Sequence, residues 1–391
     1  MFVAAAPPGG GRTEATPRFK RHLTLFCVCP AAEKALKQIF GSILGGFLTS
    51  NPNIDAEVTA LTEPCVLATI DLYNDITAAL LPTPAKCHYT FNLRDVSKVF
   101  QGMLMITARK MQKVERALKL WVHEAMRVFH DRLINAGDQR WFTEKLVELL
   151  KTHFSVDWKH DDVFENYQRP IMFADFVSKA AEREYEEVPD IKKATKILDG
   201  YLEEYNLANS TQMNLVLFYD AVCHVSRLSR IIRQPRGNAM LVGVGGSGKQ
   251  SLTRLAASAA EYELFQIELT RGYGKPEFHD DIKNLMRTAG VNGDPIVWLF
   301  TDTQIVEESF VEDINNLLNA GEVPNMWPQD ELDKVINDMR PVVKELGGAQ
   351  TRDNVWRTFV SRVRMNLHVV LCMSPVGDSF RIRCRNFASL V

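Results

Sequence analysis

The sequence has 391 residues, of which 46% are hydrophobic and 24% are charged, and its formal net charge is −2. This composition is typical of a folded globular protein and excludes a disordered, collagen-like or disulfide-scaffold chain. The length is sufficient for two or three structural units, each with its own core. Because lysine and arginine form no long cluster, the charge pattern also disfavours a dedicated nucleic-acid-binding protein.

The cysteines and the hydropathy predict an intracellular protein. The seven cysteines are scattered, at positions 27, 29, 65, 87, 223, 372 and 384. The close pair Cys27 and Cys29 fits no zinc-site spacing, so we expect free, reduced thiols. No apolar run approaches the roughly 18–20 residues that span a bilayer, and Met1–Ala6 is too short for a secretory signal. We therefore expect no membrane contact and a place in the cytosol or a structure facing it.

The first part of the chain predicts a loop, a short strand and a helical bundle. Residues 7–21 are punctuated by glycine and proline and predict a loop, and the apolar run Leu23–Val28 predicts a buried strand. Apolar residues then recur at helical spacing, which predicts an all-helical bundle over residues 31–151. The expected helices include 31–48, 57–81 and 139–151, with two further apolar stripes at 96–104 and 118–133.

Residues 155–210 are acidic and less regular, and include the run from Glu182 to Pro189. We interpret this stretch as a solvated connecting face; a binding tail is the alternative.

Beyond residue 213 the pattern predicts an α/β fold. A helix through Leu217, Val222 and Ile231 is followed by alternating strand and helix patterns. The strand candidates are Ala239–Val242, Leu264–Leu269, Ile296–Thr301 and Leu367–Met373. Such alternation is typical of a parallel sheet with covering helices.

A glycine-rich loop carries the clearest chemical signal. The seven residues Gly243, Val244, Gly245, Gly246, Ser247, Gly248 and Lys249 lie directly between the first of these strands and a helix that begins near Gln250. Glycines allow backbone N–H groups to turn toward phosphates, the helix N-terminus adds positive potential, and the lysine reaches the outer phosphates. An accidental glycine turn explains this context poorly, so we predict nucleotide binding.

One position of this motif departs from the usual pattern. The residue after the lysine is normally Ser or Thr, which ligates magnesium, but here it is Gln250, followed by Ser251. One residue turns a helix by about 100°, so Ser251 is an alternative magnesium ligand but no direct replacement. We expect weakened magnesium binding.

The buried strand Ile296–Thr301 ends at Asp302, the position of the aspartate that holds magnesium, here through water, in P-loop ATPases. Enzymes that hydrolyse ATP by the AAA+ plan place a glutamate next, whereas this chain has Thr303 and then Gln304. Glu307 and Glu308 follow at the start of a predicted helix, where carboxylates are usually structural. The pattern favours nucleotide binding without efficient hydrolysis.

The last strand, Leu367–Met373, ends before Ser374, where AAA+ domains place a polar sensor of the γ-phosphate. Serine is shorter than the usual asparagine and predicts a weaker sensor. His368, within this apolar strand, is expected to be a core histidine rather than a ligand.

With these motifs, the sequence resembles a dynein heavy chain of the axonemal type over nearly its whole length. Residues 7–21 are similar to a loop of the third AAA+ module, and residues 81–95 and 121–133 to the helical lid of that module. Residues 234–249 and 315–324 are similar to the fourth module.

The resemblance implies an α/β AAA+ P-loop large subdomain preceded by a helical lid. The implied boundaries are 1–28 for the end of the third large subdomain, 29–154 for its lid, 155–212 for a linker and the start of the fourth module, and 213–391 for the fourth large subdomain. It also implies that this module ends at Val391 before its own lid, and that the microtubule-binding stalk is absent.

The resemblance further implies a microtubule motor of the cytoskeleton, in the axoneme of cilia or flagella. Its ligands would be ATP or ADP with magnesium, and its partners would be other AAA+ modules and dynein subunits, with microtubules reached only through the full-length parent. Arg18 is similar to an arginine that reaches a neighbouring module's nucleotide, although Arg21 or a structural role remains an alternative.

Two other functions are compatible with the motifs. A P-loop small-molecule kinase would need an acceptor pocket and a base, and no such constellation is visible in the sequence. Alternatively, the chain acts only as an interaction or dominant-negative piece without motor activity.

Overall fold

The computed structural model describes residues 2–4, 15–83, 85–86, 88–164, 166, 170–178 and 183–387. Most of the glycine- and proline-rich loop at 7–21, together with Cys87, lies outside these residues. The described cysteines are free thiols. Within the described chain, no helix is long and apolar enough to cross a membrane.

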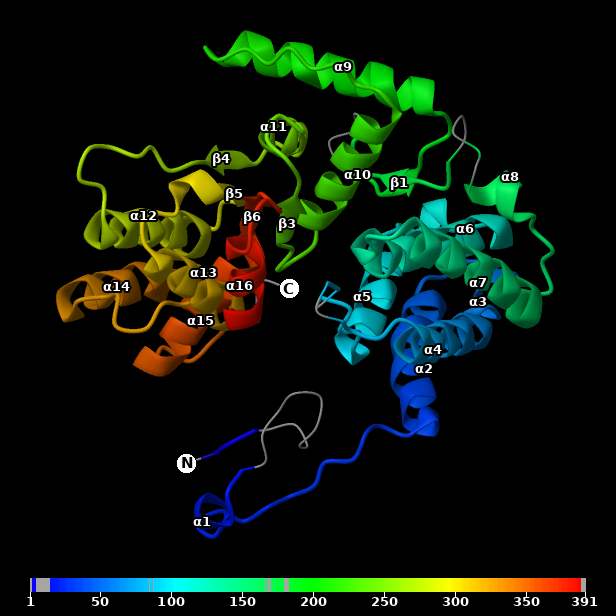
Figure 1. The fold of residues 1–391 in the computed structure, drawn as a ribbon, viewed down its shortest axis with the longest axis horizontal. Coiled ribbons are helices and arrows are strands. Elements are labelled where there is room, and N and C mark those ends of the chain that lie inside the picture. Colours follow the sequence, from blue (N-terminus) through cyan, green and yellow to red (C-terminus); the bar gives the residue numbers. More distant parts are fainter. Residues whose placement is uncertain are drawn as a thin grey trace.

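The first half of the chain folds as the predicted helical bundle (Figure 1). Its helices are α2 (Glu33–Ser50), α3 (Ala56–Thr59), α4 (Thr62–Ala79), α5 (Leu93–Met103), α6 (Val114–Val128), α7 (Ala136–Phe154) and α8 (His160–Phe164), with short 3₁₀ turns η1 (Ala108–Lys110) and η2 (His130–Arg132). Helix α5 shows why these segments are helical. Asn92 and Asp95 form a capping box at its start. Its buried residues Val96, Val99, Phe100 and Met103 recur at helical spacing and face one core.

The chain before this bundle does not form the predicted strand. Short helix α1 (Pro17–Lys20) is followed by irregular backbone, and Leu25, Phe26 and Val28 are exposed. The prediction of a buried strand at 23–28 is therefore wrong for this structure. The segment is apolar, but no described strand pairs with it.

The second half is an α/β unit around a four-stranded parallel sheet, as predicted. The strands are β3 (Ala239–Val242), β4 (Glu263–Phe265), β5 (Ile296–Thr301) and β6 (Leu367–Met373), in the order β3-β6-β5-β4. Three of these strands match the expected bounds, whereas β4 ends at Phe265, short of the predicted Leu269. The helices are α9 (Ile191–Ala208), α10 (Tyr219–Arg233), α11 (Lys249–Ala259), α12 (Lys275–Arg287), α13 (Glu308–Ala320), α14 (Gln329–Glu345), α15 (Arg352–Asn366) and α16 (Ser379–Asn386), with a π-helical turn η3 (Thr288–Asn292) and a 3₁₀ turn η4 (Asp302–Gln304).

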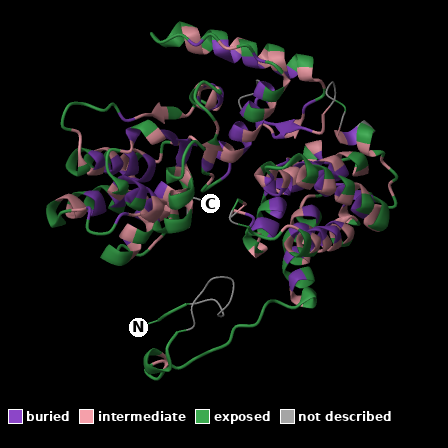
Figure 2. Ribbon diagram, in the orientation of Figure 1, coloured by how far each residue is buried: buried purple, intermediate pink, exposed green. Residues whose placement is uncertain are grey.

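Both faces of the sheet are covered, which explains the unbroken apolar runs of its central strands. On β5, Trp298 and Phe300 pack in the core formed with α12–α15, while Val297 and Leu299 pack with α9–α11. Successive side chains of a strand point to opposite faces, so one six-residue strand contributes to both cores (Figure 2). His368 is buried in β6 and its Nδ1 lies 2.8 Å from the Gly237 carbonyl oxygen, which confirms the core role.

The acidic stretch between the halves is partly buried, so its interpretation as a solvated connecting face is wrong there. Tyr185 and Val188 are buried. The strands β1 (Phe173–Ala174) and β2 (Glu186–Glu187) pair antiparallel. Phe173 packs in the core of the helical bundle and the adjacent Ala174 packs in the core of the α/β unit. Two glutamates of this stretch pair with bundle lysines: Lys119 Nζ lies 3.0 Å from Glu187 Oε1, and Lys110 Nζ lies 2.5 Å from Glu186 Oε2.

A buried ion pair joins the two halves. Glu124 of α6 is fully buried and accepts hydrogen bonds from the Arg230 guanidinium of α10 and, at 2.7 Å, from the Tyr185 hydroxyl. A side chain at Gly102 would overlap the Glu124 carboxylate, so glycine is required there. Burial alone would lower the pKa of Arg230, but the Glu124 carboxylate raises it. Separating the bundle from the α/β unit would break this buried ion pair, which is strongly destabilising.

We predict that Glu124→Gln destabilises the fold by about 3–5 kcal/mol, because removing one partner leaves the Arg230 charge buried and uncompensated. Urea unfolding measures the change. Glu115→Gln is the matched control: Glu115 pairs with Lys119 one helical turn away and its side chain is 67% exposed, so a loss below about 0.5 kcal/mol is expected. Equal losses in the two variants would contradict the assignment.

Candidate functional site

The glycine-rich loop lies between β3 and α11, as the sequence predicts. Gly246 and Gly248 have φ angles of 76° and 79°, in the left-handed region that glycine adopts without steric cost. The Gly243 N–H donates to the Met373 carbonyl oxygen at 3.1 Å, which fixes the start of the loop against β6. Residues 244–247 are exposed. The loop is therefore anchored at its base and open at its turn.

Lys249 directs its ammonium group over this loop. Its Nζ donates to the carbonyl oxygens of Gly243 at 2.6 Å and Val244 at 2.8 Å, and lies 3.1 Å from Ser247 Oγ. A Cβ at Gly243 would lie 3.0 Å from Ser247 Oγ, a tight contact that would push on the Ser247 side chain. The positive charge is held beside the first turn of α11, where backbone N–H groups lack helical partners.

These residues fit a nucleotide's phosphates. A Cβ at Gly245 or Gly246 would meet no atom within 4 Å, so the loop leaves space on its open side. The N-terminus of α11, the glycine loop and the Lys249 ammonium are the three features that hold a polyphosphate in P-loop proteins. The loop residues 243–248, with Lys249, would hold the phosphates.

Parallel pairing places two further predicted residues at the same edge of the sheet. Thr301 of β5 is opposite Cys372 of β6, and Val242 of β3 is opposite Met373. Asp302, Ser374 and Gly243 each follow their strand directly, so they meet at one edge. Asp302 Oδ2 accepts a hydrogen bond from the Ser374 backbone N–H at 3.0 Å. The sequence suggested a sensor role for the Ser374 side chain and missed this backbone contact with Asp302.

The buried thiol of Cys372 lies close enough to Lys249 and Asp302 for both charges to affect its pKa. Burial raises the pKa of Cys372 to about 11; the nearby Lys249 charge opposes this rise and the Asp302 carboxylate adds to it. Both charges therefore act on the same side chain. Nothing in the sequence singled out Cys372 as part of the site, because its position in an apolar strand is typical of a core residue.

The position after Asp302 carries no carboxylate. In the 3₁₀ turn η4, the Thr303 hydroxyl is hydrogen-bonded to the Thr301 hydroxyl at 2.8 Å. Gln304 is buried: its Oε1 accepts from the Thr301 N–H at 2.8 Å, and its Nε2 donates to the Ile267 carbonyl oxygen at 2.6 Å. Gln304 thus links the end of β5 to the segment after β4 and orients the turn that presents Asp302.

The two nearby glutamates have partners at the start of α13, and their structural role stays a prediction. Glu308 begins α13 and pairs with Arg383 of α16 at 2.5 Å. Glu307 precedes that helix and accepts a hydrogen bond from Ser309 Oγ at 3.0 Å. Both glutamates are exposed and come four or more residues after Thr303.

The structure leaves the magnesium prediction open. Gln250 is exposed and Ser251 half-buried in the first turn of α11. In the described chain no three His, Cys, Asp or Glu residues are grouped as metal ligands. A magnesium ion at this site would therefore depend on phosphate oxygens and Asp302.

Arg18 is not part of this site. It lies on α1, which Figure 1 shows far from the start of α11. Its predicted contact with a neighbouring module stays a prediction.

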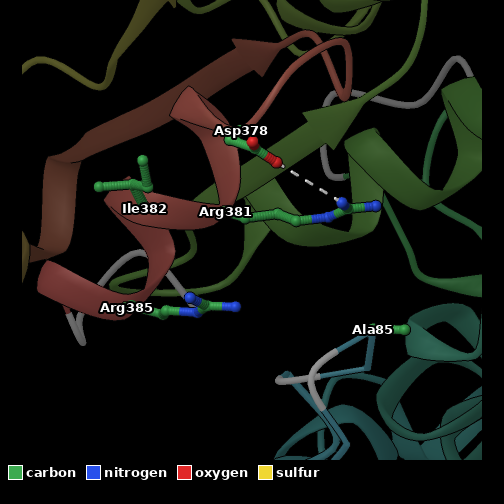
Figure 3. A pocket seen from close by; sticks show the side chains of 5 residues that line it. All are labelled: Ala85, Asp378, Arg381, Ile382 and Arg385. Carbon is green, nitrogen blue, oxygen red and sulfur yellow. Dashed lines mark ion pairs between the residues drawn. The ribbon is translucent and has the colours of Figure 1, made fainter.

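The cleft in Figure 3 is also separate from the loop. It has a volume of about 470 Å³ and is lined by Ala85 of the bundle and by Asp378, Arg381, Ile382 and Arg385 in or beside α16. None of these five residues belongs to the glycine loop.

Comparison with known proteins agrees with this description. Residues 213–391 match the family "P-loop containing dynein motor region D4", and residues 65–165 match the "AAA+ lid domain". The fold and site therefore define an AAA+ P-loop module preceded by an AAA+ lid. Among known proteins, dynein axonemal heavy chain 6 of Homo sapiens is 50% identical over 395 residues. Dynein axonemal heavy chain 1 of Mus musculus is 48% identical over 405 residues, and the dynein-1-beta heavy chain of the flagellar inner arm I1 complex of Chlamydomonas reinhardtii is 45% identical over 394 residues.

These alignments cover all of this chain and 9% of each relative. The chain is homologous over its whole length to axonemal dynein heavy chains, which implies a location in the axonemes of cilia and flagella. It corresponds to a short segment of the much longer relatives.

We predict that Gln304→Leu destabilises the chain by about 2–6 kcal/mol, because it leaves the buried Thr301 N–H and Ile267 carbonyl oxygen unpaired, at about 1–3 kcal/mol each. Gln329→Leu is the control, since Gln329 is exposed at the start of α14 and bonds only within its own helix. Urea unfolding compares the two. A Gln304 variant as stable as the control would contradict the proposed orientation of the Asp302 turn.

Proposed function

We propose that this chain is a nucleotide-binding segment of an ATP-driven microtubule motor ring, and that its site binds ATP or ADP as a structural or regulatory ligand with little hydrolysis. The observation that carries the proposal is a glycine-rich phosphate loop at the same sheet edge as Asp302, which is followed directly by Thr303 and Gln304 and not by a glutamate. The homology to axonemal dynein heavy chains supports the motor context.

The binding half of the proposal rests on Lys249. Its ammonium is within 3.1 Å of three oxygen atoms of the loop, and phosphate oxygens are stronger acceptors than these neutral groups. Asp302 lies at the same edge of the sheet and is the natural magnesium contact. Gln250 has a side-chain amide where related sites have a hydroxyl that ligates magnesium. We therefore expect magnesium to bind more weakly here than at those sites.

The hydrolysis half rests on Thr303. Its hydroxyl is engaged with Thr301, and a threonine does not accept a proton at neutral pH. Loss of a positioned general base costs about 10²–10⁴ in rate. Ser374 contributes its backbone N–H to Asp302, an arrangement that holds the aspartate but adds no group for the attacking water.

The structure also supports a regulatory route. Helix α10 carries Arg230, which binds the bundle through Glu124, and packs against α11, which begins at Lys249. The bundle would be the lid of the preceding module, and the other AAA+ modules and dynein subunits would be the partners. Microtubules would be reached only through the full-length motor.

We predict that Lys249→Ala weakens ATP and ADP binding about 10–100-fold, because a hydrogen bond to a charged group contributes about 1.5–3 kcal/mol. Calorimetric titration measures the affinity, and circular dichroism checks that the variant is folded. Lys334→Ala, at an exposed position of α14, is the control and should bind like wild type. Failure of well-folded wild-type protein to bind either nucleotide would contradict the proposal.

A further inference from the structure

The turn between α10 and β3 holds an arginine in a strained conformation. Arg236 has a φ angle of 62°, in the left-handed region that side-chain-bearing residues seldom adopt. The turn is fixed around it. Asn238 Nδ2 donates to the Arg236 carbonyl oxygen at 3.2 Å, and Asn238 Oδ1 accepts from the Val369 N–H of β6 at 2.8 Å.

The next residue, Gly237, is tightly packed against the backbone of α10. A Cβ at Gly237 would overlap the Ile231 carbonyl oxygen, so only glycine fits. Strained backbone of this kind persists where the surroundings impose it and is concentrated at functional sites. The strained backbone at Arg236 therefore points to a function for its side chain.

A second arginine faces the same place. Arg364, in the last turn of α15, passes its methylene groups against Gly321, where a Cβ would meet its Cγ at 2.5 Å. Burial lowers the pKa of Arg364, and the positive charge of Arg236 lowers it further. Within the described chain, neither guanidinium forms an ion pair with a carboxylate. Two like charges are thus held near each other without a counter-charge.

The two arginines line one cleft of about 130 Å³. Its remaining lining is Asn238, Gly321 and the apolar side chains Leu317, Leu318, Val363, Leu367 and Val369. Leu367 is the first residue of β6, and Asn238 directly precedes β3. The cleft therefore lies at the end of the sheet opposite to Lys249, and it is separate from the nucleotide site.

A purely structural role explains only part of this arrangement. A cation in the last turn of a helix is favourable, which accounts for one charge at the end of α15. Arg364 is the basic residue of that turn, whereas Arg236 lies outside the helix, in the turn before β3. Helix stabilisation explains neither the strain at Arg236 nor the convergence of two unpaired arginines on one cleft.

We propose that this cleft binds a phosphate group, either free phosphate or a phosphomonoester. Guanidinium groups match the geometry of phosphate oxygens through paired hydrogen bonds. A cavity of about 150 Å³ holds six heavy atoms of benzene, so the cleft suits the five heavy atoms of phosphate. A phosphate dianion neutralises both arginines, whereas a carboxylate neutralises one.

The test uses the full chain carrying Lys249→Ala, so that phosphate binding at the glycine loop is suppressed and the outcome is independent of the nucleotide proposal. Inorganic phosphate, phosphoserine and acetate are titrated by calorimetry, each at constant ionic strength. We expect saturable binding of phosphate that is at least tenfold tighter than that of acetate. Phosphoserine binding equal to phosphate identifies a phosphomonoester site; its failure to bind identifies a site for free phosphate.

Three further variants in that background locate the binding. Arg364→Gln and Arg236→Asn should each weaken phosphate binding at least tenfold; asparagine tolerates the left-handed backbone, so the second variant removes charge while keeping the turn. Arg357→Gln, an exposed arginine on the same helix, should leave binding unchanged. Circular dichroism checks that each variant is folded. Phosphate affinity unchanged in both cleft variants, or acetate binding as tight as phosphate, would overturn the proposal.

Discussion

The parallel pairing of β6 between β3 and β5 determines where the functional groups of this chain lie. Residues that directly follow parallel strands meet at one edge of the sheet. The Gly243 N–H is bound to the end of β6, and Asp302 is bound by the first N–H after β6. Lys249, Asp302 and Ser374 are far apart in sequence, and a one-residue slip of β6 would separate the contacts between them.

The second constraint is the buried ion pair between the bundle and the α/β unit. Glu124 of α6 is in contact with Gly102 of α5, Arg230 of α10 and the Tyr185 hydroxyl, and Gly102 leaves space for its carboxylate. Since α10 also packs on α11, the bundle and the phosphate loop are connected through two helices. The AAA+ lid and the P-loop unit are therefore coupled through α6, α10 and α11.

Motifs and apolar runs were sufficient to predict the central features from the sequence. The bounds of β3, β5 and β6 follow from their short apolar runs, and the loop at 243–249 follows from glycine spacing. Contacts between distant segments were not predictable. The run Leu23–Val28 has strand composition but no described partner, while Tyr185 and Val188 are buried within an acidic stretch because β1 and β2 fold it onto the bundle. The backbone contact of Ser374 depends on register, which composition does not encode.

The claim that this site binds ATP without turning it over has a direct test. The purified chain is incubated with ATP and magnesium, free nucleotide is removed, and the bound nucleotide is released by denaturation and separated by chromatography at successive times. With Thr303 in place of a general base, the account predicts that bound nucleotide remains ATP for as long as it stays bound. Steady conversion of bound ATP to ADP, absent in Lys249→Ala, would contradict it.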